Sequence, residues 1–249
     1  MKKYIITKLL TSKKVWLGIS SIVIPIIATF LGADEESVSK IWWSLLAMLG
    51  GYLDWCLEQY ETFNCNQVVF IGDILDNHAF SYHEPDPDGM SAGLELEKTI
   101  EKVAKWYKAF EYADVCIGNH DRMASRKAMS GGIPAAWIRS YNDVLKTPNW
   151  NWVESVTYDN VLFEHGEGGQ AAAKAKNNML SSVCGHTHTL AYVQWFCGKK
   201  YRVFGMQVGC GVDSTSYAAA YAKNFKKQSI GCSVVLNNGT LPINLLMPL

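Results

Sequence analysis

The sequence carries no excess of charge and no repetitive or low-complexity tract. Its 249 residues include 23 basic and 23 acidic side chains, so the formal net charge at pH 7 is zero. This balance argues against a protein held on nucleic acid mainly by bulk charge, although it leaves room for a local basic face. Hydrophobic residues make up 49% of the chain and charged residues 18%. The composition therefore predicts a globular chain rather than a disordered one.

The seven cysteines lack the paired spacing of a structural zinc site. We interpret them as ordinary buried thiols of a protein in a reducing compartment. A chain of 249 residues is long enough for one sizeable core, or for a core with a small appendage.

Residues 1–60 differ from the rest of the chain. Several lysines precede an uncharged run at residues 15–33, close to the ~20 residues that cross a bilayer, and a second run covers 41–53. The interpretation that we favour is a membrane hairpin over residues 15–53, with both ends in the cytoplasm because the lysines precede the first run. The alternative is a buried strand and helix of a soluble domain, which Pro25 supports.

The remaining residues, 61–249, alternate between strand and helix patterns and predict an α/β domain. Strands are expected at residues 67–71, 115–117, 153–158, 161–164, 182–184, 191–196, 201–208 and 232–236. Helices are expected at residues 94–110, 135–145 and 171–180, and tight turns at 159–160 and 237–239.

Polar residues gather just after several of the predicted strands. They are Asp73, Asp76, Asn119, His120, Asp121, His165, His186 and His188. Loops at the carboxyl ends of parallel strands meet at one edge of a sheet, so these side chains are expected to converge. Nitrogen and oxygen ligands of this kind suit borderline divalent ions such as manganese, iron or zinc.

Four short motifs also occur in a fixed order. They are Gly-Asp-x-x-Asp at 72–76, Gly-Asn-His-Asp at 118–121, His-Gly at 165–166 and Gly-His-Thr-His at 185–188. Together they resemble the calcineurin-like metallophosphoesterases, and phage-type members in particular. The resemblance implies a two-sheet sandwich flanked by helices. It also implies hydrolysis of a phosphomonoester or phosphodiester with divalent ions, Mn²⁺ first, with Fe, Zn or Mg as alternatives.

The resemblance implies a metal-binding role for five residues. Asp73 would bridge two metal ions, and His188 would bind the first of them. Asn119, His165 and His186 would complete the protein ligands of the second ion. Two ions held in this way would clamp the phosphoryl oxygens during hydrolysis.

Five further residues would surround the metals. His120 would protonate the leaving oxygen or stabilise charge there, and Asp121 would orient its ring. Asp76 would contact the metal ligands without binding the metal itself. His78 would line the substrate cleft or hydrogen-bond locally, and Arg122 would contact a phosphate or pair with Asp86 or Asp88.

One motif of the family is missing. The family begins with Asp-x-His on its first strand, and both residues bind the first metal. The nearest comparable stretch is residues 19–25, where Ser21 and Val23 occupy those positions, unless a membrane hairpin has replaced the strand. Either explanation leaves the first metal with Asp73 and His188 alone, which predicts weak binding there.

Three functions therefore stay open. The first is metal-dependent hydrolysis of a phosphate ester, by a cytoplasmic domain that the hairpin would anchor to the inner face of a membrane. The second is a membrane-anchored protein whose phosphoesterase domain keeps one metal or none and acts by binding or by structure. The third is a nuclease acting on DNA, which would require a basic groove leading to His120.

Overall fold

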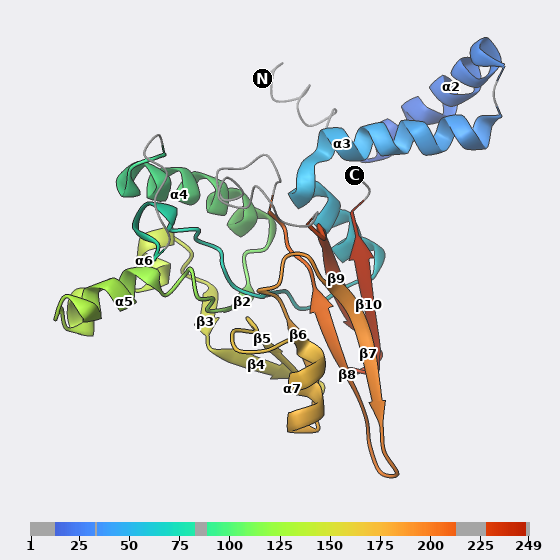
Figure 1. Cartoon of the computed structure of the whole chain (residues 1–249). Coiled ribbons are helices and arrows are strands. Elements are labelled where there is room, and N and C mark those ends of the chain that lie inside the picture. Colours follow the sequence, from blue (N-terminus) through green and yellow to red (C-terminus); the bar gives the residue numbers. More distant parts are fainter. Residues whose placement is uncertain (1–12, 33, 83–88, 213–227, 248–249) are drawn as a thin grey trace. The chain divides into compact units, whose positions relative to one another are not determined.

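The computed structural model describes residues 13–32, 34–82, 89–212 and 228–247 (Figure 1). The chain divides into two compact units, one up to Trp55 and one from Cys56 to Met247. The first unit contains α2 (Lys13–Leu31) and the beginning of α3 (Glu35–Thr62).

The helices of the first unit bear on two expectations. Within the described residues, no helix is long and apolar enough to cross a membrane. This finding gives no support to the membrane hairpin expected over residues 15–53, which stays a prediction. The alternative strand at residues 19–25 is wrong, because these residues lie inside α2 with Pro25 in its middle. Ser21 and Val23 thus belong to a helix and do not replace the missing motif on a strand.

A three-stranded parallel sheet begins the second unit. Its strands are β1 (Val69–Phe70), β2 (Ala113–Cys116) and β3 (Trp150–Val153), in the order β1-β2-β3. All four residues of the central strand β2 are buried, as expected for a parallel strand covered on both faces. Asp114 is the one charged residue among them, and its carboxylate accepts hydrogen bonds from Gln67, Asn151 and Tyr158.

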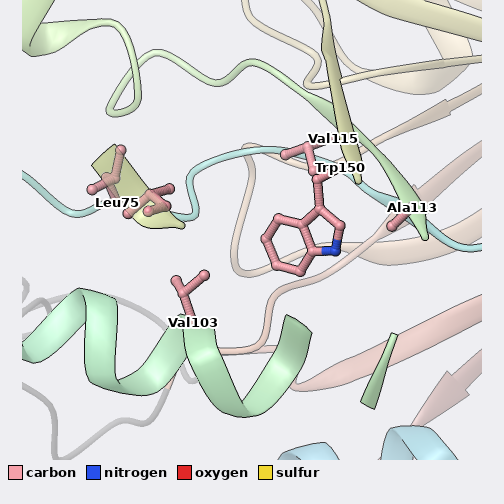
Figure 2. Packing of buried hydrophobic residues seen from close by; sticks show 6 residues of the cluster. Leu75, Val103, Ala113, Val115 and Trp150 are labelled. Atoms are coloured by element: carbon pink, nitrogen blue, oxygen red, sulfur yellow. The ribbon is translucent and has the colours of Figure 1, made fainter. Parts of the chain in front are cut away.

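Helix α4 (Ala92–Ala109) covers this sheet. It begins at Ser91, whose hydroxyl accepts a hydrogen bond from the Leu94 N–H and so satisfies one of the unpaired donors of the first turn. Apolar side chains of the helix and the sheet, together with Leu75 from the loop after β1 and Leu145 from a short helix before β3, form the first core (Figure 2). The residues labelled there are Leu75, Val103, Ala113, Val115 and Trp150.

A five-stranded mixed sheet forms the second layer of strands. Its order is β4-β5-β6-β8-β7, and β5, β6 and β8 run parallel, whereas β4 and β7 pair antiparallel at the two edges. The strands are β4 (Ser155–Tyr158), β5 (Val161–Glu164), β6 (Ser181–Cys184), β7 (Ala191–Cys197) and β8 (Arg202–Val208). The hairpin expected at residues 159–160 is confirmed, with both turn residues at positive φ.

The last strands form an antiparallel ribbon, β9 (Gly231–Leu236) and β10 (Leu241–Leu246), joined by the expected turn at 237–239. Helix α7 (Ala171–Asn178) packs on β8 at Gly205, where an added Cβ would collide with the Ala171 backbone. The close approach of helix and strand thus depends on a missing side chain.

Short helices complete the second unit. They are η1 (His78–Phe80), α5 (Met123–Ser130), η2 (Ala135–Trp137) and α6 (Tyr141–Leu145). The single helix expected at residues 135–145 is wrong, because Ser140 caps α6 by accepting from the Asp143 N–H and the chain is extended there. The described chain is thus a mixed α/β structure whose sheets are flanked by helices.

Candidate metal centre

Four polar side chains converge just beyond the carboxyl ends of β1, β2, β5 and β6. His165 Nε2 lies 3.1 Å from Asp73 Oδ2, 2.9 Å from Asn119 Oδ1 and 3.1 Å from His186 Nδ1. Asn119 Oδ1 also lies 2.9 Å from His186 Nδ1. Three of these residues, Asp73, His165 and His186, form a group whose ligand atoms all lie within 4.8 Å of one another.

The chemistry of this group fits a cation. His165 Nδ1 lies 2.7 Å from the Ile71 carbonyl oxygen, which can only accept, so Nδ1 carries the proton and Nε2 is left with a lone pair. Around Nε2 stand a carboxylate oxygen, an amide oxygen and a second imidazole nitrogen. Lone pairs facing one another repel unless a proton or a metal ion lies between them. A divalent ion that accepts mixed nitrogen and oxygen ligands meets this requirement.

The pKa values of the two histidines in the group are shifted in opposite directions. Burial raises the pKa of the Asp73 carboxyl, but its hydrogen bond with His165 and the nearby imidazoles outweigh burial and bring the pKa below its ordinary value. The pKa of His165 is raised because the Asp73 interactions outweigh burial. Burial, and then the charge of His165, lowers the pKa of His186. The lowered pKa of His186 favours the neutral imidazole that binds metals, whereas the raised pKa of His165 favours a protonated ring paired with Asp73 while no ion is bound.

Glycines let the loops approach closely. A Cβ at Gly72, whose φ is +89°, would lie 2.7 Å from His165 Nδ1. A Cβ at Gly118 would collide with the Asp73 carboxylate. Asp73 and His186 themselves have φ of 55° and 65°, a left-handed conformation that non-glycine residues seldom adopt and that is concentrated at functional sites.

Asp121 holds the loops together. Its carboxylate, 1% exposed, accepts from the backbone N–H groups of Asp73 at 2.9 Å, Leu75 at 3.0 Å and Gly118 at 2.8 Å. Burial raises the pKa of this carboxyl to about 6, although the backbone hydrogen bonds oppose the rise. The expectation that Asp121 orients the ring of His120 is corrected, because its oxygens are engaged with the backbone instead.

Asp76 takes the orienting role. His120 Nδ1 lies 2.7 Å from the Asp76 carbonyl oxygen and 3.4 Å from its carboxylate Oδ1, so Nδ1 carries a proton and Nε2 is the nitrogen left for chemistry. The hydrogen bond from Asp76 raises the pKa of His120 to about 9, against the effect of burial. The backbone N–H of His120 also donates to Asp73 Oδ1 at 2.9 Å, which places His120 beside the metal group.

The remaining expected residues lie farther from the metal group. His188 is not among its close ligand atoms, although Asp73 and the other site histidines affect its pKa, which burial lowers. Arg122 pairs with Glu167 at 3.2 Å and with Glu154, whereas the partners expected for it, Asp86 and Asp88, lie outside the described residues. His78 is buried rather than lining a cleft, and its N–H donates to Glu95 at 2.8 Å.

Two structural contributors were not anticipated from the sequence. The Ile71 carbonyl sets the tautomer of His165, and no side-chain pattern could reveal a backbone acceptor. Glu95, buried on α4, accepts from the N–H groups of His78 and Ala79 and so fixes η1 after the first loop. A carboxylate on the buried face of an amphipathic helix was the available signal for it.

No protein-family model matches this chain, and no curated protein matches its sequence.

Proposed function

We propose that this chain is a metal-dependent phosphoesterase of the calcineurin-like type. The observation that carries the proposal is the convergence of lone-pair atoms from Asp73, Asn119, His165 and His186, with His120 beside them. These are the residues that the resemblance would assign to the second metal and to the general acid. Their loops come from two sheets, which makes a chance assembly of this set improbable.

The residues would divide the chemistry between them. The four ligands would hold a divalent ion, which supplies Lewis-acid stabilisation of phosphoryl oxygen and lowers the pKa of a water nucleophile. His186 is exposed, so a substrate can reach the group from its side. His120, with its proton on Nδ1 fixed by Asp76, would present Nε2–H to the leaving oxygen as a general acid.

Binding of the first metal ion is expected to be weak. Among the described residues, Asp73 and His188 are the ones that the resemblance assigns to it, and residues 19–25 contribute no strand. We therefore propose one firmly held ion per chain, with Mn²⁺ the first choice and Fe, Zn or Mg as alternatives. The missing ligands equally favour the second candidate function, a degraded domain that binds without turnover.

Metal content and turnover separate the two functions. Full-length protein purified in detergent would be assayed for bound metal and for Mn²⁺-dependent hydrolysis of an aryl phosphodiester. We expect about one ion per chain, lost in His165→Ala. In His120→Ala the ion should stay while turnover falls by about 10²–10⁴-fold, the usual contribution of a general acid. Glu101→Gln, which changes an exposed carboxylate on α4, is the control and should change neither quantity.

Two results would count against the proposal. If the wild-type protein turned over no faster than His120→Ala while holding its ion, the degraded domain would be the better description. If His165→Ala kept its metal, the ion would lie elsewhere. Near two ions per chain would mean that further residues complete the first site.

A further inference from the structure

The segment that follows the candidate catalytic loop is basic, aromatic and exposed. Residues 122–142 contain four basic side chains and no acidic one, although the chain as a whole is neutral. Within this segment, every residue from 129 to 137 is exposed. Trp137, on η2, is 82% exposed, and Met129 and Ile133 are also among the exposed large hydrophobic residues. Such a concentration of exposed apolar side chains usually marks an interaction surface.

Hydrogen bonds and an ion pair attach the segment to the site. The Met123 N–H donates to the His120 carbonyl at 3.1 Å, so α5 (Figure 1) begins three residues after the candidate general acid. The ion pair of Arg122 with Glu167 ties that beginning to the loop that follows His165. Farther along, the Ile133 N–H donates to the Ala128 carbonyl at 2.9 Å, which folds the chain back on α5.

A second aromatic ring joins this surface. The ring of Tyr82, which is 54% exposed, lies under Lys127 Nζ at 4.3 Å and under the Arg126 guanidinium at 5.1 Å. Cations held over an aromatic face keep their charge in a fixed place while staying open to a ligand. We call Tyr82, Arg126, Lys127, Ile133, Trp137 and Arg139 the basic aromatic surface.

We propose that the basic aromatic surface binds single-stranded nucleic acid and brings its phosphodiester backbone to the metal group. Arg122 is already paired with Glu154 and Glu167, which leaves Arg126, Lys127 and Arg139 to attract phosphates. The exposed Trp137 gives an unpaired base a face to stack on. A duplex keeps its bases stacked inside and would use the cations alone. The inference rests on the proposed function, because it names the substrate class of that same site.

Binding without hydrolysis tests the inference directly. Full-length protein in EDTA would be titrated into a fluorescein-labelled 12-nucleotide oligothymidine, and anisotropy would give Kd. We expect Trp137→Ala to raise Kd about tenfold, which corresponds to ~1.4 kcal/mol. Arg126→Ala combined with Lys127→Ala should reduce the slope of log Kd against log salt by about 1.4, at ~0.7 per phosphate contact on a single strand.

Trp195→Ala is the matched control. Trp195 is also exposed, at 41%, and also lies under a cation, with Arg202 at 5.3 Å, but it stands on β7 outside the basic aromatic surface. Its replacement should leave Kd unchanged. Because Trp137 is so exposed, its loss should spare folding, which thermal melts of both variants would verify.

Several outcomes would overturn the inference. They are no oligonucleotide binding at micromolar protein, equal losses in Trp137→Ala and Trp195→Ala, and tighter Trp137-dependent binding to anionic phosphatidylglycerol vesicles than to the oligonucleotide. A Trp137-dependent dimer in sedimentation would assign the surface to a second copy of the chain. Turnover of an aryl phosphodiester without oligonucleotide binding would overturn this inference alone, whereas binding without turnover would remove the proposed function alone.

Discussion

In two site histidines, a hydrogen bond to a backbone carbonyl determines which ring nitrogen carries the proton. The Ile71 carbonyl holds the Nδ1 proton of His165, and the Asp76 carbonyl holds that of His120. In both rings Nε2 is therefore the nitrogen that is not bonded to a carbonyl, but its surroundings differ between the two. His165 Nε2 faces Asp73 and Asn119, where it would bind an ion, whereas His120 Nε2 would be the nitrogen that transfers a proton.

Asp76 is expected to control the charge of His120. In protein stripped of metal with EDTA, His120 should titrate at a pKa of about 9 because of its hydrogen bond with Asp76. Asp76→Asn keeps the backbone carbonyl but removes the carboxylate, so the pKa should fall toward the ordinary ~6.5. NMR titration of the imidazole C–H resonances would measure both values.

The raised pKa of His120 also makes the free energy of unfolding depend on pH. A histidine whose folded pKa exceeds its unfolded pKa contributes stability that is fully present below ~6.5 and is lost as the pH rises through about 9. Asp76→Asn should flatten this dependence, whereas Asp143→Asn, an exposed carboxylate elsewhere, should leave it intact. An unchanged His120 titration in Asp76→Asn would show that another group sets its pKa.

At the scale of elements, the loops after β1 and β2 are joined through Asp121. The carboxylate receives N–H groups from both loops, and Gly118 makes room for Asp73 to lie against the second loop. The position of the Asp73 side chain thus depends on glycine at residue 118.

Gly118→Ala should disrupt the packing of these two loops. The new Cβ would collide with the Asp73 side chain and backbone, and overpacking of this kind typically costs ~1–3 kcal/mol. We expect a lower midpoint of urea unfolding together with weaker metal binding. Gly93→Ala is the matched control, because Gly93 lies in α4 with nothing within 4 Å of an added Cβ, and it should gain ~0.4–1 kcal/mol. Equal stability of the two variants would contradict the packing argument.

The elements differed in how well the sequence predicted them. The β4–β5 hairpin was predictable because Asp159 and Asn160 tolerate the left-handed turn that a two-residue loop needs. Residues 19–25 were not, because a short apolar run fits a strand and a buried helix equally well. The break before α6 depended on the Ser140 cap, a local hydrogen bond that competes with helix continuation.

The site was predictable to a similar extent. Motif order at strand ends indicated that Asp73, Asn119, His165 and His186 would converge, and the structure brings them together. The partner of His120 was predicted wrongly, since Asp121 is its neighbour in sequence but turns toward backbone donors. Side-chain direction in a loop follows from tertiary hydrogen bonding, which sequence spacing does not encode.

At the scale of the whole second unit, the metal group joins the two larger sheets. Asp73 and Asn119 follow strands of the three-stranded sheet, whereas His165 and His186 follow strands of the five-stranded sheet. An ion bound to all four would cross-link the sheets at their carboxyl ends. Metal binding should therefore be coupled to the unfolding of the unit as a whole rather than of one loop.

This coupling predicts a shift in melting temperature. Mn²⁺ at 100 times its Kd should add ~2.7 kcal/mol, because it binds the folded chain and not the unfolded one. At ~2–4 °C per kcal/mol for a unit of this size, Tm should rise by about 5–11 °C, and EDTA should reverse the rise. His165→Ala removes the ligand at the centre of the group, so its Tm should not respond to Mn²⁺, whatever its starting value. Trp195→Ala should respond like the wild type. A Tm that ignores Mn²⁺ in the wild type, or that rises equally in His165→Ala, would show that these four residues do not hold an ion between the sheets.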